Sequence, residues 1–414
     1  MTVTLSSCTA SEPQDSGASA GSTPDATPSA PEPSAPEPTP TDDPPASQPP
    51  RPRAHKPPAP PEPDCVEATL NDLTLAGRAA QLLMIGVPAD ASGPDSVVAG
   101  AVGELGVGAV ILTGRSESGV QTTRALVDEL GDLVPRGPGG TIGLEVAVDQ
   151  EGGQVQVLQG PGFDAMPTAS VQGGWSDARL RRASSRWARQ LRSAGATLNL
   201  SPVADVVPPG RANAPIGQFD REFAGSPRPV AAKVAAFVRG SVAAGVGTTV
   251  KHFPGLGRAS GNTDDTSGVI DELTRREDPL LAPFRSGIAA GTPYVMMSTA
   301  RYTRLDPDSI ATFSPFVIGT MLRGDLGFDG LVISDDVGVA TGVQDVAVGR
   351  RAVRFVAAGG DVVLTVVASQ AAEMVQAVVD RARRSPRLRR RVDEAALRVL
   401  RRKADVGLLG CRPS

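Results

Sequence analysis

The sequence contains little histidine, cysteine or aromatic side chain. Of its 414 residues two are His and three are Cys, and aromatic residues make up 3%. Since His55, His252 and the cysteines lie far apart along the chain, they do not form the ligand clusters of a metal centre, and we expect no cofactor. No apolar run reaches the roughly 18 residues that a membrane-spanning helix needs. These absences exclude zinc chemistry and a helical membrane protein.

Charge of one sign is also lacking. The formal net charge is −4, and arginines alternate with acidic residues along most of the chain. Nucleic-acid-binding proteins usually carry a basic excess, so we expect no nucleic-acid partner. The sequence gives no sign of the oligomeric state, and a monomer is the default expectation.

Proline is abundant but unevenly distributed. The chain has 38 Pro, of which 18 lie in the first 63 positions. Residues 9–64 contain no aromatic residue, Leu, Ile or Val, so they cannot bury enough apolar surface to offset their chain entropy. We therefore expect a disordered linker over 9–64, followed by one large domain over 65–411.

The N-terminus carries a motif of its own. Leu5-Ser6-Ser7-Cys8 resembles the lipobox of bacterial lipoproteins, whose cysteine is lipidated. A charged segment and an apolar segment should precede it, and residues 1–4 supply neither. Either the natural start lies upstream, or Cys8 is incidental and the linker is an ordinary tail. We favour the lipoprotein hypothesis, which predicts an extracytoplasmic protein, lipid-anchored or secreted, that meets the membrane only through its anchor.

The other two cysteines bracket the expected domain. Cys65 and Cys411 lie at its two ends, and domain termini are often close together. An extracytoplasmic location permits disulfides, so we predict a Cys65–Cys411 bridge. The alternative is two unrelated free thiols.

Short apolar runs alternate with amphipathic helical patterns from residue 66 onward. Near-continuous apolar runs are typical of parallel strands covered by helices on both faces. Eight such units predict an α/β fold, a single-domain (β/α)8 barrel of the TIM type. An open, doubly wound sheet is the alternative, but no GxGxxG motif opens a helix here. The predicted strands are 82–87, 108–112, 142–148, 197–200, 247–251, 293–298, 330–334 and 361–366.

Polar residues follow several of these strands. In such a barrel the chemistry lies at the carboxyl ends of the strands. A rim of carboxylates with one Lys, one His and one Arg suits sugar recognition, and paired carboxylates suit glycoside hydrolysis. Taken singly, each residue has a structural explanation, such as a helix cap or a tight turn. The rim residues are Asp149, Asp205, Asp220, Arg221, Lys251, His252, Asp264, Asp265, Asp335 and Asp336.

Five segments in this order resemble glycoside hydrolase family 3. They are AVDQEGGQVQ (147–156), NLSPVADV (199–206), KHFPGLG (251–257), LVISDDVGV (331–339) and DEAALRVLRRKADVGLL (393–409). The chain is most similar to the single-domain bacterial β-N-acetylglucosaminidases, or β-N-acetylhexosaminidases, of peptidoglycan turnover. The resemblance implies a retaining mechanism with Asp335 as nucleophile. It also implies a substrate pocket and its supports, made by Asp149, Arg221, Lys251 and His252 together with Asp205 and Asp336.

Two departures from the family pattern affect the expected chemistry. The loop after the fifth strand normally carries Asp-Ser/Thr-His, whose His is the general acid/base, but residues 262–268 contain no His. Asp265 is the nearest match and our expected acid/base, and Asp264 is the alternative, provided that desolvation raises the pKa. Two arginines of the family motif are replaced by Gln154 and Val157, which puts recognition of an acidic muramic-acid unit in doubt.

Two functions of different classes remain open at this stage. The first is a retaining β-N-acetylhexosaminidase that acts on N-acetylglucosamine-containing cell-wall glycans. The second is a non-catalytic or weakly active sugar-binding surface protein that has lost the acid/base His. An intact Asp335 favours the enzyme, because a binding protein needs no nucleophile. A glycoside phosphorylase is a third reading, since phosphate relieves the need for a strong base in the second step.

Overall fold

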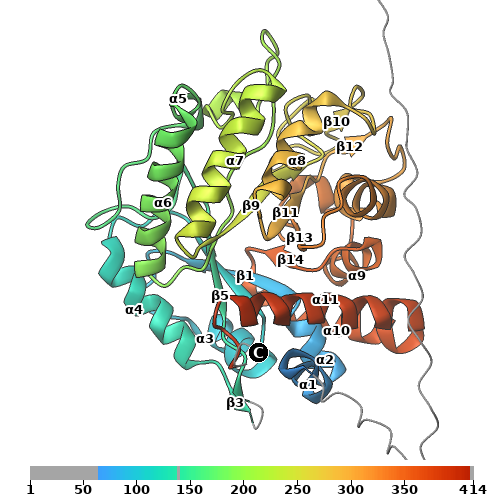
Figure 1. Cartoon of the computed structure of the whole chain (residues 1–414). Helices are drawn as coiled ribbons and strands as arrows, with labels where there is room; N and C mark the ends of the chain where they lie inside the picture. Colours follow the sequence, from blue (N-terminus) through green and yellow to red (C-terminus); the bar gives the residue numbers. More distant parts are fainter. Residues whose placement is uncertain (1–63, 138–139, 411–414) are drawn as a thin grey trace, which may run out of the picture. The chain divides into compact units, whose positions relative to one another are not determined.

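The central element of the fold is a barrel of eight parallel strands (Figure 1). A computed structural model describes residues 64–137 and 140–410. All neighbouring barrel strands run parallel, and each strand from the first to the sixth pairs with the next barrel strand along the chain. The strands are β1 (Leu83–Pro88), β2 (Ala109–Thr113), β5 (Glu145–Val148), β8 (Leu198–Asn199), β9 (Gly247–Phe253), β11 (Tyr294–Met297), β13 (Leu331–Ser334) and β14 (Val363–Thr365).

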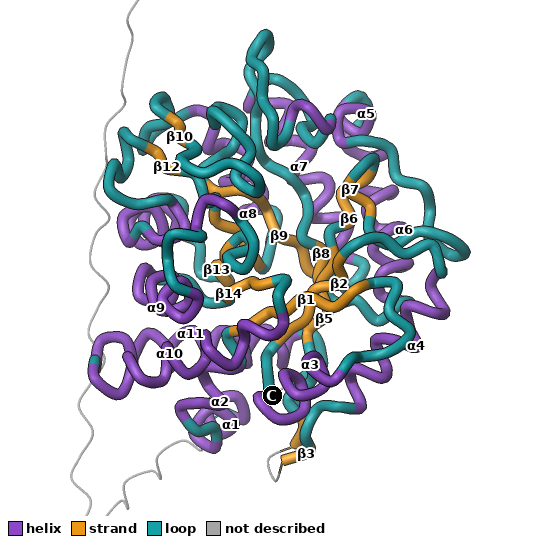
Figure 2. The backbone as a smooth tube through the Cα atoms, turned by 180° about the vertical axis from the view of Figure 1, so that it is seen from behind, coloured by secondary structure: helices purple, strands orange, loops and turns teal. Residues whose placement is uncertain are grey.

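The barrel is closed between its last two strands. β1 pairs with β14, so the first and eighth strands are neighbours. A parallel bridge joins Ile333 to Val362, and the amide of Ser334 donates to the Val362 carbonyl at 3.0 Å. Figure 2 shows the strands gathered at the centre with helices around them. The predicted (β/α)8 barrel and its eight strands are confirmed, with small differences at the strand ends.

The helices lie outside the barrel and connect its strands. Within the described residues, no helix has the length and apolar content needed to cross a bilayer. Two connections contain π-helical segments: Gly100–Leu105 continues α3 between β1 and β2, and Phe316–Asp325 lies between β11 and β13. The α-helices are α1 (Cys65–Asp72), α2 (Leu75–Ala80), α3 (Ser96–Ala99), α4 (Gly119–Asp132), α5 (Ala169–Gly173), α6 (Asp177–Ser193), α7 (Pro227–Ala243), α8 (Ala282–Ala289), α9 (Val348–Ala358), α10 (Ala371–Arg384) and α11 (Pro386–Asp405).

Helix α6 shows how the sequence defines these elements. The Ser176 side chain caps its first turn by accepting a hydrogen bond from the amide of Arg179. Leu180, Trp187 and neighbouring apolar residues at helical spacing are buried, while the arginines face outward. The chain turns at Gly195, where φ is +87°, a value that glycine adopts readily.

One predicted helix begins later than the sequence pattern suggested. The apolar spacing of Leu280, Leu281, Phe284 and Ile288 predicts a helix that starts near Asp271. However, Asp271 ends the short strand β10 (Ile270–Asp271), and its carboxylate accepts hydrogen bonds from the Leu273 and Thr274 amides. The helix starts only after Asp278, with a 3₁₀ turn that leads into α8. Pro279 explains this start, because proline fits the first helical turn and not a helix interior.

The two ends of the described chain meet beside α11. Val66 of α1, Leu400 of α11 and Leu409 form a small apolar cluster separate from the main core. Cys65 is the first residue of α1 and is disulfide-bonded. Cys411, its predicted partner, lies outside the described residues, as do Cys8 and nearly all of the predicted linker. The Cys65–Cys411 pairing, the linker and the lipid anchor therefore stay predictions.

Candidate active site

The carboxyl ends of the barrel strands surround a pocket of about 460 Å³. Asp149 directly follows β5, Lys251 and His252 stand near the end of β9, and Asp335 directly follows β13. Arg221 reaches the same pocket from the loop between β8 and α7. Parallel strands end at one rim of a barrel, which explains why residues almost 200 positions apart in sequence line one pocket. The five residues predicted to line the site are thus brought together.

A chain of ion pairs runs across the floor of this pocket. The Lys251 ammonium lies 2.5 Å from a carboxylate oxygen of Asp149 and 2.7 Å from one of Glu151. Arg221 donates two hydrogen bonds to the two oxygens of Glu151, at 2.8 and 2.9 Å, and a third to the Pro215 carbonyl at 2.9 Å. Both cations are therefore fixed in orientation by the protein itself.

Burial and charge pairing act in opposite directions on these groups. Burial alone would raise the pKa of Glu151, but Arg221 and Lys251 outweigh it and hold that pKa well below its usual range. Burial would likewise lower the pKa of Lys251, yet the carboxylates of Asp149 and Glu151 raise it. The same balance raises the pKa of Arg221. All of these groups therefore remain charged at neutral pH.

Glu151 is the residue that the sequence analysis did not single out. It belongs to the short strand β6 (Gln150–Gly152) and is buried, although it lies only two positions from Asp149 in the DQEGG motif. Its carboxylate joins the two pocket cations, whereas the sequence pattern indicated only a polar turn. The signal available in the sequence was an acidic residue directly before the Gly152-Gly153 pair, whose two glycines adopt positive φ in the structure.

Replacing Glu151 by Gln should destabilise the protein strongly. The substitution leaves Lys251 with Asp149 as its carboxylate partner and removes the carboxylate partner of Arg221. Removing one side of a buried ion pair typically costs about 3–5 kcal/mol. Urea unfolding measures the change. The matched control is Asp164→Asn, which removes the exposed pair with Arg186 and should cost less than about 1 kcal/mol. Equal losses for both variants would contradict the proposed role of Glu151.

His252 is oriented by Asp205 from behind the pocket. The Nδ1 atom of His252 lies 2.7 Å from a carboxylate oxygen of the fully buried Asp205. The other carboxylate oxygen accepts from the amides of Leu256, at 2.7 Å, and of His252. With Nδ1 engaged, the Nε2 atom of the ring is left for the pocket. Asp205 thus occupies the supporting position that we predicted.

Asp335 and Asp336 begin the loop after β13. The pKa of Asp335 is raised to about 6, mainly by burial; His252 opposes this rise, and the charge of Asp264 adds to it. Asp336 accepts hydrogen bonds from the amides of Gly338, at 2.7 Å, and Val366, at 3.2 Å. Asp336 therefore fixes the backbone next to Asp335. The Asp335 carboxylate lines the pocket and is mostly ionised above about pH 6.

The two candidate acid/base residues differ in their surroundings. Asp264 lines the pocket, and its backbone carbonyl accepts hydrogen bonds from the Thr341 amide, at 3.1 Å, and the Thr341 hydroxyl, at 3.0 Å. The Asp265 carboxylate is outside the pocket lining, where it accepts from the side chains of Asn262 and Thr266. The geometry therefore favours Asp264, whereas the sequence resemblance favoured Asp265.

The described residues contain no group of His, Cys, Asp and Glu side chains arranged to hold a metal ion. The pocket offers carboxylates, an ammonium, a guanidinium and an imidazole. These groups can bind hydroxyl and amide groups and can transfer protons to or from a bound sugar. One carboxylate can attack an electrophilic carbon.

Comparison with known proteins identifies the family. The glycosyl hydrolase family 3 N-terminal domain matches residues 74–402, and the chain belongs to this family. The beta-hexosaminidase of Stenotrophomonas maltophilia K279a is 38% identical over 229 residues, which cover 53% of this chain and 66% of that relative. The match thus spans just under two thirds of the curated relative. The family predicted from the five sequence segments is confirmed.

Solved structures agree with this assignment. The β-N-acetylhexosaminidase of Beutenbergia cavernae is 45% identical with a TM-score of 0.78, and the match covers 80% of this chain and 99% of that one. A family 3 β-N-acetylglucosaminidase from Paenibacillus is 28% identical with a TM-score of 0.72, covering 83% and 64% of the two chains. The barrel and the order of its elements are therefore shared with this group of proteins.

Proposed function

We propose that this protein is a retaining β-N-acetylhexosaminidase that uses Asp335 as its nucleophile. The observation that carries the proposal is the position of Asp335 at the barrel rim, in one pocket with the fixed Asp149–Lys251–Glu151–Arg221 chain and with His252. The names of the related proteins, beta-hexosaminidase and β-N-acetylhexosaminidase, support the same activity. N-acetylglucosamine-containing glycans are accordingly the proposed substrates.

The reaction proceeds in two displacements. Asp335 attacks the anomeric carbon, the glycosidic C–O bond breaks, and Asp264 gives a proton to the departing oxygen. Water then attacks the glycosyl-enzyme, Asp264 takes the proton from that water, and Asp335 leaves as a carboxylate. The anomeric configuration is inverted twice and hence retained. Both residues are exposed, but Asp264 lines the pocket and its charge acts on Asp335, so it suits this second role better than Asp265, which is outside the lining.

The ion-pair chain binds the sugar without mobile side chains. Asp149 and Lys251 are held to each other at 2.5 Å, so their remaining lone pairs and protons point in set directions toward sugar hydroxyls. His252, with Nδ1 bound to Asp205, presents Nε2 to the same ligand. Because these groups are ordered before the substrate arrives, little side-chain entropy is lost on binding.

The charge balance of the pocket favours an uncharged substrate. Both cations near the sugar, Lys251 and Arg221, are already paired with Glu151, whereas the Asp335 carboxylate forms no ion pair within the part of the chain that the structure describes. The lining of the pocket also includes apolar side chains, among them Val157 and the exposed Val339. We therefore propose neutral N-acetylglucosaminides as substrates in preference to glycosides with a carboxylate on the leaving unit.

Turnover of an aryl β-N-acetylglucosaminide tests the proposed activity. We expect cleavage with retention, and kcat/KM should fall as the pH drops below about 6, since Asp335 must be ionised to attack. Proton NMR of the first-formed sugar anomer and a pH series measure both. If an aryl glycoside with its good leaving group is bound but never cleaved, the sugar-binding protein is the better description.

The location of the enzyme is a separate proposal. The lipobox-like Cys8 and the Pro-rich residues after it support an extracytoplasmic protein held by a lipid anchor. Metabolic labelling with a radioactive fatty acid tests it, in the natural host and with the natural gene's upstream sequence intact, with Cys8→Ser as the matched control. Label that persists in Cys8→Ser, or no label in the parent chain, would contradict the anchor.

A further inference from the structure

A second pocket lies where the ends of α9, α10 and α11 meet. It has a volume of about 340 Å³ and shares no lining residue with the candidate active site. Four arginines line it, and no acidic side chain does: Arg354 of α9, Arg381 of α10, and Arg387 and Arg391 of α11. We call this cavity the arginine pocket. Three of the arginines, Arg354, Arg381 and Arg387, form no ion pair within the described residues, and like charges around one cavity repel each other unless an anion neutralises them.

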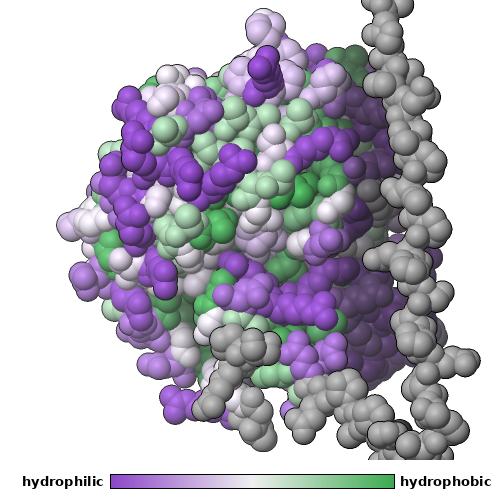
Figure 3. Space-filling view, in the orientation of Figure 1, coloured by the Kyte–Doolittle hydropathy of each residue, from purple (hydrophilic) through white to green (hydrophobic). Residues whose placement is uncertain are grey.

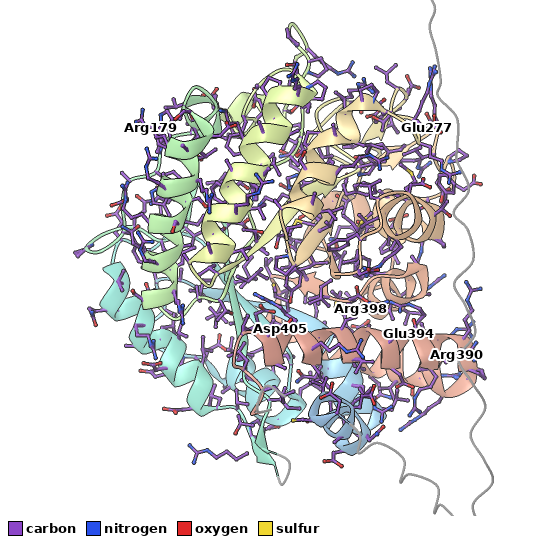
Figure 4. All side chains as sticks on the ribbon, in the orientation of Figure 1. Arg179, Glu277, Arg390, Glu394, Arg398 and Asp405 are labelled. Atoms are coloured by element: carbon purple, nitrogen blue, oxygen red, sulfur yellow. The ribbon has the colours of Figure 1, made fainter. Side chains whose placement is uncertain are left out.

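The sequence around the arginine pocket is basic over a longer stretch. Residues 381–391 read RARRSPRLRRR, with seven arginines and no acidic residue, although the whole chain has a net charge of −4. Figure 4 labels Arg390 near the start of α11, and Figure 3 shows hydrophilic surface along this helix. The basic surface therefore continues beyond the cavity, which suits a ligand with more than one negative charge.

Two of the four arginines are fixed before any ligand binds. Arg391 donates to Glu394 at 2.6 Å and to Asp361 at 3.3 Å, while its Nε atom is buried without a hydrogen-bond partner among the described residues. The Arg354 guanidinium lies 4.6 Å from the centre of the Phe313 ring. Arg381 and Arg387 are exposed and form no ion pair with the described residues, so their donors are available.

The surroundings narrow the class of ligand. Guanidinium groups bind phosphate with paired hydrogen bonds, so clustered arginines favour phosphate groups. Phe313 is buried beneath Arg354, so the pocket offers no exposed aromatic ring for the stacking of nucleic-acid bases. The large apolar side chains that are exposed within the described residues all lie outside α9, α10 and α11, so nothing there would insert into a bilayer.

We propose that the arginine pocket binds a linear polymer of phosphate groups that carries no bases. One phosphate occupies the pocket between Arg381, Arg387 and Arg391, and its neighbours along the polymer lie on the arginines of residues 383–390. Binding at this site would hold the enzyme on a phosphate-rich polymer while leaving the candidate active site open, because the two pockets share no residue.

Calorimetric titration of the full chain with a short linear inorganic polyphosphate tests the site. The variant is the double substitution Arg381→Gln with Arg387→Gln. The matched control is Arg181→Gln with Arg182→Gln, which removes the same charge from two exposed arginines of α6, away from any described pocket. At about 0.15 M salt we expect parent and control to bind alike and the pocket variant to bind at least about tenfold more weakly. Hydrolysis of the aryl glycoside should be unchanged in both variants.

Three outcomes would overturn the proposal. One is the absence of binding to polyphosphate at this salt concentration. Another is an equal loss of polyphosphate affinity in the pocket variant and the α6 control, because binding would then depend on the net charge of the protein and not on this pocket. The third is tighter binding to a single-stranded oligonucleotide or to anionic phospholipid vesicles than to polyphosphate, because the ligand would then be a nucleic acid or a membrane surface.

Discussion

Asp335→Asn should abolish turnover of activated and natural glycosides alike, by about 10⁴-fold or more in kcat. Asn has nearly the same shape as Asp but cannot form the glycosyl ester. The neighbouring carboxylate of Asp336 should not replace it, because the amides of Gly338 and Val366 already bind that carboxylate. Steady-state rates on an aryl and an unactivated β-N-acetylglucosaminide measure the loss. Retention of more than a few per cent of the parent rate on either substrate would remove Asp335 from the nucleophile's role.

The same variant should be more stable than the parent at neutral pH. Burial raises the pKa of Asp335 to about 6, so the folded state binds its proton more tightly than the unfolded state does. The ionised carboxylate consequently costs stability, and the cost grows as the pH rises from about 4 to about 6. We expect Asp335→Asn to gain about 1–3 kcal/mol at pH 7.5 and almost nothing at pH 4. A gain in stability would show that the loss of activity comes from the missing nucleophile, because a damaged fold would be less stable than the parent.

Asp264→Asn should separate the two kinds of substrate. An aryl leaving group departs without a proton, so its kcat/KM should stay near the parent value, whereas an unactivated glycoside should lose about 10²–10⁴-fold. The second displacement also needs a base, so the glycosyl-enzyme should accumulate on the aryl substrate and give a burst of released phenol. Azide attacks without base assistance and should restore kcat as the glycosyl azide forms.

Asp265→Asn is the matched control for this experiment. It makes the same chemical change one residue away, on a carboxylate that is outside the pocket lining and hydrogen-bonded to Asn262 and Thr266. We expect its rates to remain within about twofold of the parent, because exposed polar substitutions have small effects. If Asp265→Asn shows the substrate split and the azide rescue while Asp264→Asn does not, the assignment made from the sequence resemblance is the right one.

The sequence predicted the barrel well because its strands carry a strong physical signal. Runs such as LLMIGV at 82–87 and LVIS at 331–334 are apolar on both faces, and only a parallel sheet wrapped by helices buries both. The helix expected from Asp271 failed because the carboxylate of Asp271 binds local amides, which a periodicity of apolar residues cannot reveal. The hydrogen bonds of the Asp271 carboxylate stabilise a turn at this point and prevent the helix from starting there.

The sequence could predict which residues line the candidate site, because they follow strands, but it could not predict the hydrogen bonds and ion pairs between them. That Asp149, Lys251 and Asp335 share a rim follows from the strand order. Glu151 joins Lys251 to Arg221, but Arg221 lies 70 positions after Glu151 on a separate loop, and the sequence does not show where that loop folds. Likewise, the sequence resemblance favoured Asp265, and only the structure shows that Asp264 lines the pocket, where its main-chain carbonyl accepts a hydrogen bond from Thr341.

That bond has an evolutionary consequence. Thr341 holds position 264 by its main-chain carbonyl, so the loop keeps its place over the rim whatever side chain stands there. Proton donation and loop geometry are thus inherited separately. A substitution at position 264 would therefore change the proton donor without removing this anchor of the loop, so that catalytic strength could evolve while the barrel stays the same.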